Sequence, residues 1–547
     1  MQLAASLLVI SVIMFICVIF NKVSGKLGVP MLLAFIVFGL FFGNGGIVKI
    51  VNVDIEVAKT VCSVSLIFIM FYGGFGTKWS AAKPVAVKAG ILSSVGTFLT
   101  ALLVGLFCYL VLKIGFIESM LLGSVIASTD AASVFSILRS RKLNFKYNTA
   151  SLLEVESGSN DPFSYMLTVV FLTLLKSGSI SVWDSVYLVL SQVILGAACG
   201  VAIAWFAVRF FKRFSFGSSG FDAIFMMVVA LFAYALPESI GGIPFLKSGN
   251  GYLSVYIAGI IIGNSKIKSK KSLVNFFDAL TGLMQMFLFF LLGVLASPMK
   301  IIDPKVLVIS LSVAAFLTFV ARPLAVFAIL TPFKSRINQQ LLVSWAGMRG
   351  AASIVFAIMA ITCDGVILEN DILHIVFGIV LFSILLQGTL MPYVGKTLKM
   401  TDDSEDVMKT FTDYVDETAV QFIRFKIPGN HPWAGKKVAE IALPPECILA
   451  LLIRNGEKMT LNGSTVIKSG DVLIMSGNAT DTDDRISLYE KKLRQNDYEV
   501  GKRISEVSFD GNLVIMIRRG DSVIIPRGTT LLCEGDVLVL NESQLAA

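Results

Sequence analysis

The chain has 547 residues, of which 55% are hydrophobic and 15% are charged, and its mean hydropathy is +0.79. This composition excludes an ordinary soluble protein and predicts a polytopic membrane protein. The net charge of +8 does not indicate nucleic-acid binding, because the basic residues before residue 400 fall mostly in alternate short loops. Apolar runs continue to residue 398, and ordinary soluble sequence begins near residue 401.

Apolar runs of the length that crosses a bilayer occur thirteen times. The first run has no basic segment before it and no small-residue cleavage site after it, so we expect a retained transmembrane helix and not a signal peptide. The predicted spans lie near residues 3–20, 29–43, 57–76, 87–112, 118–138, 151–175, 185–208, 220–237, 252–264, 275–296, 305–331, 339–361 and 371–395.

The basic residues set the expected orientation of these spans. One set of loops and span ends carries twenty lysines and arginines, and the alternate set carries seven. Because basic loops stay in the cytoplasm, the N-terminus is expected outside and the soluble tail inside. We therefore expect a multi-pass protein of the plasma (bacterial inner) membrane, in contact with membrane lipids.

The fifth and twelfth spans are each interrupted by a charge among small residues. The fifth contains Ser128-Thr129-Asp130, and the twelfth contains Gly347-Met348-Arg349-Gly350. Such positions suit helices that unwind at the midplane and present backbone groups to an ion. The twelfth span comes seven positions after the fifth, and because this offset is odd the two run in opposite directions, as in an inverted-repeat transporter. Close helix packing alone would explain the glycines and alanines, but not Asp130 and Arg349.

The sixth span begins with three carboxylates, Glu154, Glu156 and Asp161. On one helix, Ser157 and Asp161 share a face, and so do Glu156 and Asn160. An ionisable group inside a membrane costs roughly 2.5 kcal/mol or more and indicates an ion path. The alternative interpretation, an interfacial helix start with its acids in water, applies more readily to Glu154 than to Asp161.

The eleventh span carries Arg322 before Pro323, and a buried arginine requires a carboxylate. Glu156, Asp130 and Asp161 are the candidates. We favour a structural ion pair of Arg322 with Glu156, which leaves Asp161 free to exchange its ligand. Arg349 is then expected to offset charge or to support the crossing of the broken spans.

Together, these motifs resemble the NhaP-type branch of the monovalent cation/proton antiporters, and especially its potassium/proton members. The resemblance covers roughly residues 1–395. It implies an inverted-repeat fold with broken crossing helices, a homodimer and elevator-like alternating access. It also implies that Asp161 binds the proton or the cation, with Asp130 assisting, Ser157 and the backbone at Thr129 as oxygen ligands, and Asn160 orienting the site.

The chemistry of the residues agrees with this resemblance. A hard alkali cation prefers several oxygen ligands, and competition between a proton and a cation for one carboxylate is itself a coupling mechanism. A single exchanging aspartate preceded by Asn160 resembles the electroneutral exchangers. One departure is Tyr72, where many members of the family have an acid, and it bears on sodium selectivity.

The tail contains an internal repeat of about 65 residues. Gly470-Asp471-Val472 recurs as Gly535-Asp536-Val537, and each unit shows alternating strands and one short helix. Both units resemble the C-terminal module of potassium-conductance regulators (RCK-C, or TrkA-C). We predict a membrane domain at 1–398, a linker at 399–417, and small α+β cytosolic domains at 418–482 and 490–547.

The resemblance implies a dimerising sensor for a small regulator such as cyclic di-AMP, or a unit that only stabilises the dimer. The strand that includes Arg454, followed by Asn455, is the expected regulatory site. The sequence shows no metal-ligand cluster, catalytic triad or phosphate-binding loop. We therefore expect no enzyme, cofactor or catalytic residue, and no metal beyond the transported alkali cation.

These observations favour an electroneutral potassium/proton antiporter, with sodium as a second candidate substrate. One alternative is a sodium/proton antiporter with the same mechanism. A regulator-gated cation channel is the alternative from a different class, but the chain lacks a carbonyl-rich selectivity-filter sequence such as TVGYG.

Overall fold

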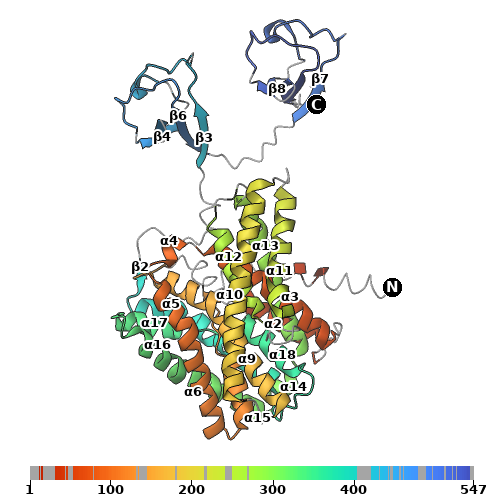
Figure 1. The fold of residues 1–547 in the computed structure, drawn as a ribbon, viewed down its shortest axis with the longest axis vertical. Coiled ribbons are helices and arrows are strands. Elements are labelled where there is room, and N and C mark those ends of the chain that lie inside the picture. The colour runs from red at the N-terminus through yellow and green to blue at the C-terminus, as the bar shows by residue number, and fades with distance from the viewer. Residues whose placement is uncertain are drawn as a thin grey trace. The chain divides into compact units, whose positions relative to one another are not determined.

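The computed structural model divides into two compact units, Met1–Glu417 and Thr418–Ala547 (Figure 1). The first unit is helical and the second is built from strands. The structure describes residues 11–12, 14–15, 31–43, 45–46, 53–77, 79–130, 133–134, 144–178, 181–214, 219–240, 249–265, 267, 270–402, 420–429, 431–441, 443, 447–454, 457–459, 461–478, 488–495, 497–509, 513–519, 522–524 and 526–541.

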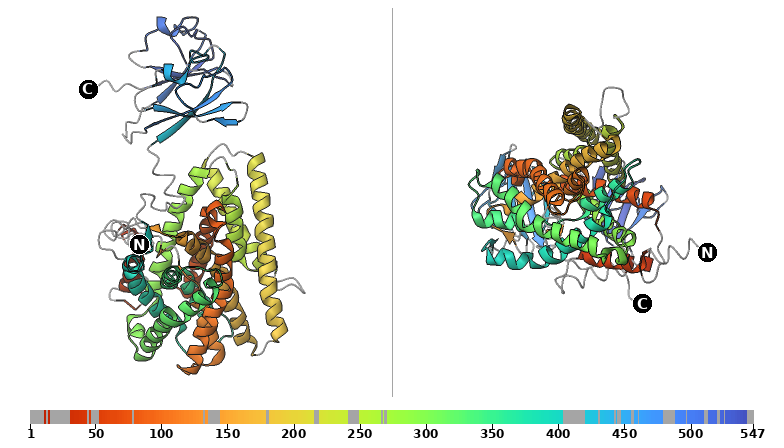
Figure 2. Two further views of the ribbon diagram at one scale, coloured as in Figure 1. Left: turned by 90° about the vertical axis from the view of Figure 1, so that its left-hand side faces the viewer. Right: turned by 90° about the horizontal axis from the view of Figure 1, so that it is seen from below.

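The helices of the first unit pack as two bundles. The first bundle comprises α2 (Met31–Phe42), α3 (Ile55–Gly76), α10 (Val182–Arg213), α11 (Ser219–Ile240), α12 (Gly251–Gly263) and α13 (Lys270–Leu295). Glycines allow the close approach of its helices. A Cβ on Gly293 of α13, for example, would lie 2.2 Å from the carbonyl oxygen of Ile36 on α2. Helix α10 runs along one edge of the unit (Figure 2).

The second bundle carries the interrupted spans. It comprises α5 (Ala86–Ile91), η1 (Leu92–Gly96), α6 (Thr97–Leu110), α7 (Phe116–Val125), α9 (Thr149–Ser177), α15 (Pro304–Phe316), η2 (Leu317–Ala321), α16 (Arg322–Leu330), α17 (Ile337–Trp345), α18 (Ala351–Ile361), α19 (Ile372–Phe382), η3 (Ser383–Gly388) and α20 (Thr389–Thr397). The three η segments are single π-helical turns inside otherwise continuous helices. Short helices α4 (Trp79–Ala82) and α14 (Pro298–Ile301) lie in connections.

The predicted class, a polytopic helical membrane protein, is confirmed. Among the described residues, seven helices are long and apolar enough to cross a membrane, and four apolar helices are shorter. Helices occupy twelve of the thirteen predicted spans, with a break inside the fifth and the twelfth. Most of the first predicted span, near 3–20, lies outside the described residues, so thirteen stays a prediction.

The tail is β-rich, and its described residues form two four-stranded sheets. Its first sheet has the order β3 (Val420–Lys426), β6 (Val472–Asn478), β4 (Cys447–Arg454), β5 (Glu457–Met459). The second repeats that order with β7 (Leu488–Lys492), β10 (Val537–Asn541), β8 (Val514–Arg519) and β9 (Ser522–Ile524). The short helix expected in each unit is one 3₁₀ turn, at Val438–Glu440 and Ile504–Glu506. A further strand pair, β1 (Asn144–Phe145) with β2 (Thr401–Asp402), ties the start of α9 to the residues after α20.

An arginine–aspartate clamp recurs in both tail units. Arg454 donates from Nε and Nη2 to the two carboxylate oxygens of Asp471, at 2.8 and 2.7 Å, and from Nη2 to the carbonyl of Val466. Arg519 and Asp536 reproduce the clamp in the second unit. The hydrogen bonds from Arg454 hold the pKa of the Asp471 carboxyl below its usual value, against the opposing effect of burial. Each clamp thus joins the last residue of one strand to the turn before another.

We predict that Arg454→Gln loosens the first tail unit alone. Removing the guanidinium leaves a buried carboxylate short of donors, which costs about 1–3 kcal/mol. Hydrogen exchange of the full-length protein should show faster amide exchange in β4 and β6 and unchanged exchange in β8 and β10. Arg424→Gln, at an exposed arginine of β3, is the control.

The stability that the Arg454–Asp471 clamp gives to the first tail unit should also depend on pH. Because the folded-state pKa of Asp471 is depressed, this stabilisation is fully present above the unfolded-state pKa of about 3.9. The stabilisation should be lost as the pH falls through the folded-state pKa of Asp471. Equal amide exchange of β4 and β6 in Arg454→Gln and in the wild type at neutral pH would contradict a stabilising role of the clamp.

Candidate functional site

The two interrupted spans meet at their breaks. Helix α7 ends at Val125, and residues 127–130 leave helical geometry before the chain becomes helical again at 133–134. Residues 347–350 separate α17 from α18 in the same way. The backbone N–H of Asp130 donates to the carbonyl of Met348 at 2.8 Å. The two breaks are therefore hydrogen-bonded to each other.

Arg349 pairs with backbone carbonyls of the break that follows helix α7. Its side chain is fully buried, and Nη1 donates to the carbonyls of Ala127 and Ser128 at 3.1 and 2.7 Å. Ala127 and Ser128 lie beyond the last residue of α7, where the backbone leaves helical hydrogen bonding, and a charged donor satisfies their carbonyls in the absence of water. Arg349 supports the crossing directly, from one break to the other.

A second set of polar groups, which the sequence analysis did not identify, fixes the backbone of the α17–α18 break. The N–H of Arg349 donates to Ser383 Oγ at 2.9 Å, and Ser383 donates to the side chain of Gln387. Gln387 and Trp345 exchange two further hydrogen bonds at 3.2 and 3.3 Å. Ser383 and Gln387 belong to η3, a π-helical turn of the kind that often marks functional sites, but this turn is visible only in the structure and no sequence signal pointed to the two residues.

Helix α9 brings the predicted polar residues onto the α7 break. Ser157 Oγ donates to the Thr129 carbonyl at 2.7 Å, and Asn160 Nδ2 donates to Thr129 Oγ1 at 2.5 Å. Asn160 Nδ2 also lies 3.2 Å from Glu156 Oε1. The Thr129 carbonyl, expected from the sequence as a cation ligand, thus accepts a hydrogen bond from Ser157.

Glu156 and Arg322 form a buried ion pair. Arg322 Nη2 lies 2.8 Å from Glu156 Oε2, and the two side chains are 2% and 1% exposed. Of the three carboxylates considered from the sequence, Glu156 is therefore the one that receives this guanidinium. The pair joins α9 to α16, and so holds the helix of Asp161 in place.

Asp130 and Asp161 differ in their surroundings. Asp130 Oδ2 accepts a hydrogen bond from Ser133 Oγ at 2.6 Å, and a Cβ on Gly350 would lie only 2.0 Å from that oxygen. Asp161 lies half-buried on α9, near Ser128 and Asp130. Its Oδ1 atom is buried, and no residue in the described part of the chain bonds to it.

The two remaining site predictions lie in the tail. The guanidinium of Arg454 is engaged by Asp471 and Val466. Asn455 lies outside the described residues.

Comparison with known proteins gives two family matches. Residues 11–396 match the model of the sodium/hydrogen exchanger, transmembrane family, and residues 422–485 match the TrkA-C domain.

Individual relatives extend over most of the chain. The K(+)/H(+) antiporter NhaP of Alkalimonas amylolytica is 30% identical over 88% of this chain and 82% of its own length. The K(+)/H(+) antiporter NhaP2 of Shewanella sp. (strain MR-4) is 27% identical over 84% of this chain and 79% of its own. The structure of the sodium proton antiporter MjNhaP1 from Methanocaldococcus jannaschii at pH 8 has a TM-score of 0.63 at 23% identity, and covers 73% of this chain and 99% of that one. That structural similarity shows a common fold.

We predict that Glu156→Gln and Arg322→Gln are each strongly destabilising, by about 3–5 kcal/mol, because each leaves the other charge buried and uncompensated. The double variant should be less destabilised than the sum of the two single variants. Thermal melting of the purified protein in one detergent, at one pH, measures all four members of the cycle. Additive losses would show that the two side chains contribute independently of each other.

Proposed function

This chain belongs to the sodium/hydrogen exchanger family, and from that membership we propose that it exchanges potassium ions for protons. The observation that carries the proposal is the buried Oδ1 of Asp161, which has no partner among the described residues. A carboxylate oxygen held in a membrane helix without a donor is satisfied by a proton or by a cation.

One carboxylate that takes either a proton or a cation couples the two fluxes. A carrier that crosses the membrane with Asp161 loaded in one form or the other exchanges one cation for one proton. Asn160, the neighbouring amide, adds no second titrating group. We therefore propose that the exchange is electroneutral.

Asp130, Ser157 and Thr129 lie around Asp161 and supply the further oxygen atoms that a dehydrated alkali cation prefers. We propose them as ligands, with Asn160 as the residue that holds Thr129 in place. Potassium is the proposed cation because the two curated relatives are named as K(+)/H(+) antiporters. The solved structure is of a sodium proton antiporter, so sodium/proton exchange by the same site is the second candidate. Family membership removes the channel alternative.

The tail is proposed to regulate exchange by binding a small ligand such as a cyclic dinucleotide beside Arg454 and Asn455. A ligand there would compete with the Arg454–Asp471 clamp, which would couple its binding to the stability of the first tail unit. The distribution of basic loops supports a plasma-membrane location with the tail in the cytoplasm. A homodimer belongs to the same proposal, as does the absence of any resident cofactor or enzymatic activity.

Asp161→Asn should abolish exchange in proteoliposomes that contain a pH-sensitive dye and an imposed proton gradient. The amide cannot exchange a proton for a cation, although its volume is nearly that of the carboxylate. Asp364→Asn, at an exposed loop position, is the isosteric control and should retain exchange. In the wild type, external potassium should dissipate the gradient equally with the membrane potential clamped and unclamped.

Three outcomes of that experiment contradict parts of the proposal. Exchange retained in Asp161→Asn removes Asp161 from the central role. Dissipation by sodium alone moves the assignment to the second candidate. Cation flux without proton movement excludes antiport.

Gly350→Ala should reduce exchange at least tenfold while leaving the protein folded. The added methyl group would overlap Asp130 Oδ2 and displace that carboxylate from the crossing. Gly282→Ala is the matched control, because a Cβ on Gly282 of α13 meets no atom within 4 Å. Equal transport rates for Gly350→Ala and Gly282→Ala would show that the position of Asp130 does not matter for exchange.

A further inference from the structure

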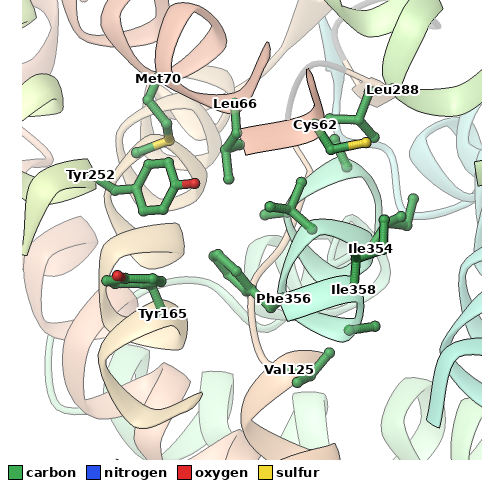
Figure 3. Packing of buried hydrophobic residues seen from close by; sticks show 14 of the residues in the cluster. Cys62, Leu66, Met70, Val125, Tyr165, Tyr252, Leu288, Ile354, Phe356 and Ile358 are labelled. Atoms are coloured by element: carbon green, nitrogen blue, oxygen red, sulfur yellow. The ribbon is translucent and has the colours of Figure 1, made fainter. Parts of the chain in front are cut away.

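Helix α12 of the first bundle packs against α9 of the second bundle. On α9, Glu154, Gly158, Asp161 and Tyr165 follow a three- or four-residue spacing and lie on one face. Tyr165 contacts Tyr252 of α12, with ring centroids 5.0 Å apart and ring planes at 81°. Figure 3 shows Tyr252 and Tyr165 together, with Phe356 of α18 beside them. The face of α9 that carries Asp161 therefore opposes α12.

One turn further along α12, Tyr256 lies against Gly158. A Cβ on Gly158 would lie 2.8 Å from Tyr256 Cε2 and 2.9 Å from its hydroxyl oxygen. Real Cβ atoms do not approach other atoms so closely, so glycine at position 158 is what admits this ring. The hydroxyl of Tyr256 is thereby held at the backbone of α9, one turn from Asp161.

The hydroxyl of Tyr256 has no hydrogen-bond partner within the parts of the chain that the structure describes, although the side chain is only 4% exposed. Tyr165, the comparable tyrosine of α9, donates to Glu238 Oε1 at 3.0 Å. The charges of Glu154 and Asp161 act on the Tyr256 hydroxyl, and the Thr77 side chain at the C-terminus of α3 approaches it without reaching hydrogen-bond geometry. Buried polar groups are nearly always paired, so an exception needs an explanation.

We propose that the Tyr256 hydroxyl is a ligand of the transported cation and a determinant of its affinity. This inference rests on the proposed function. The buried oxygen of Tyr256 and the buried Oδ1 of Asp161 are both without partners among the described residues, and they lie on opposite sides of the boundary between the bundles. A dehydrated alkali cation needs several oxygen ligands, whereas a proton on Asp161 needs none from Tyr256. Tyr256 therefore contributes to the cation-loaded form and not to the proton-loaded form.

Tyr256→Phe tests this assignment, because it removes one oxygen atom and keeps the ring that packs on Gly158. In proteoliposomes, the apparent KM for potassium should rise roughly fivefold to tenfold, the scale of one ordinary polar contact after the cost of desolvation. The maximal rate should stay within twofold. Tyr252→Phe, one turn away on the same helix and also buried, is the matched control and should leave the KM unchanged.

A binding measurement separates this role from a structural one. Without cation, Tyr256→Phe should be at least as stable as wild type, because an unpartnered buried hydroxyl has been removed. Potassium should then raise the melting temperature of the wild type more than that of the variant at equal concentration. An unchanged KM together with an equal potassium-dependent shift overturns the proposal.

Gly158→Ala provides a second variant if Tyr256→Phe does not fold. It keeps the hydroxyl but displaces the ring, and it should raise the KM in the same direction. An unchanged KM in Gly158→Ala also overturns the assignment. If the wild type exchanges potassium for protons and Tyr256→Phe has the same KM, the role of Tyr256 is wrong but the proposed function stands. If the wild type shows no exchange, the proposed function itself is wrong.

Discussion

A helix that breaks inside a membrane leaves backbone groups without partners, and no water is available there to satisfy them. In this protein, the two broken spans satisfy each other's backbone groups by hydrogen bonds. The guanidinium of Arg349 donates hydrogen bonds to the carbonyls of Ala127 and Ser128, and the N–H of Asp130 donates to the carbonyl of Met348. Because a single buried arginine bridges the breaks, the polar residues of both spans are brought to one place.

The remaining polar contacts of the second bundle can be understood as support for this crossing. Ser157 and Asn160 of α9 occupy the oxygen atoms of Thr129, and the Glu156–Arg322 pair joins the same helix to α16. Ser383 and Gln387 hold the other break from a π-helical turn. Each of these side chains has at least one partner within the second bundle, although single atoms of Asn160, Arg322 and Arg349 have none among the described residues. Asp161 Oδ1 is the carboxylate oxygen in that group of unpartnered buried atoms.

The boundary between the bundles adds a second chemical environment to the site. On the second bundle, Asp161 lies in a network of amides, hydroxyls and backbone carbonyls. On the first bundle, α12 presents aromatic rings, and only small residues such as Gly158 allow those rings to reach the backbone of α9. A cation between the two would be held by groups that belong to separately packed helices. That arrangement suits a carrier, in which binding and relative movement of the bundles must be linked.

Much of this organisation was predictable from sequence. Hydropathy located the membrane spans because their length is set by the bilayer, and Asp130 and Arg349 marked the broken spans because charges inside apolar runs require a partner. Which residue partners each buried charge depends on the tertiary structure. Glu156, Asp130 and Asp161 were all candidates for Arg322 by composition. Glu156 was the favoured one, and the packing of α9 against α16 places it beside the guanidinium. Ser383, Gln387 and Tyr256 carry no sequence signal of their own, since their roles depend on residues tens to hundreds of positions away. The repeat in the tail was visible in sequence, but its 3₁₀ turns and the clamp of Arg454 on Asp471 were decided by how each sheet folds back on itself.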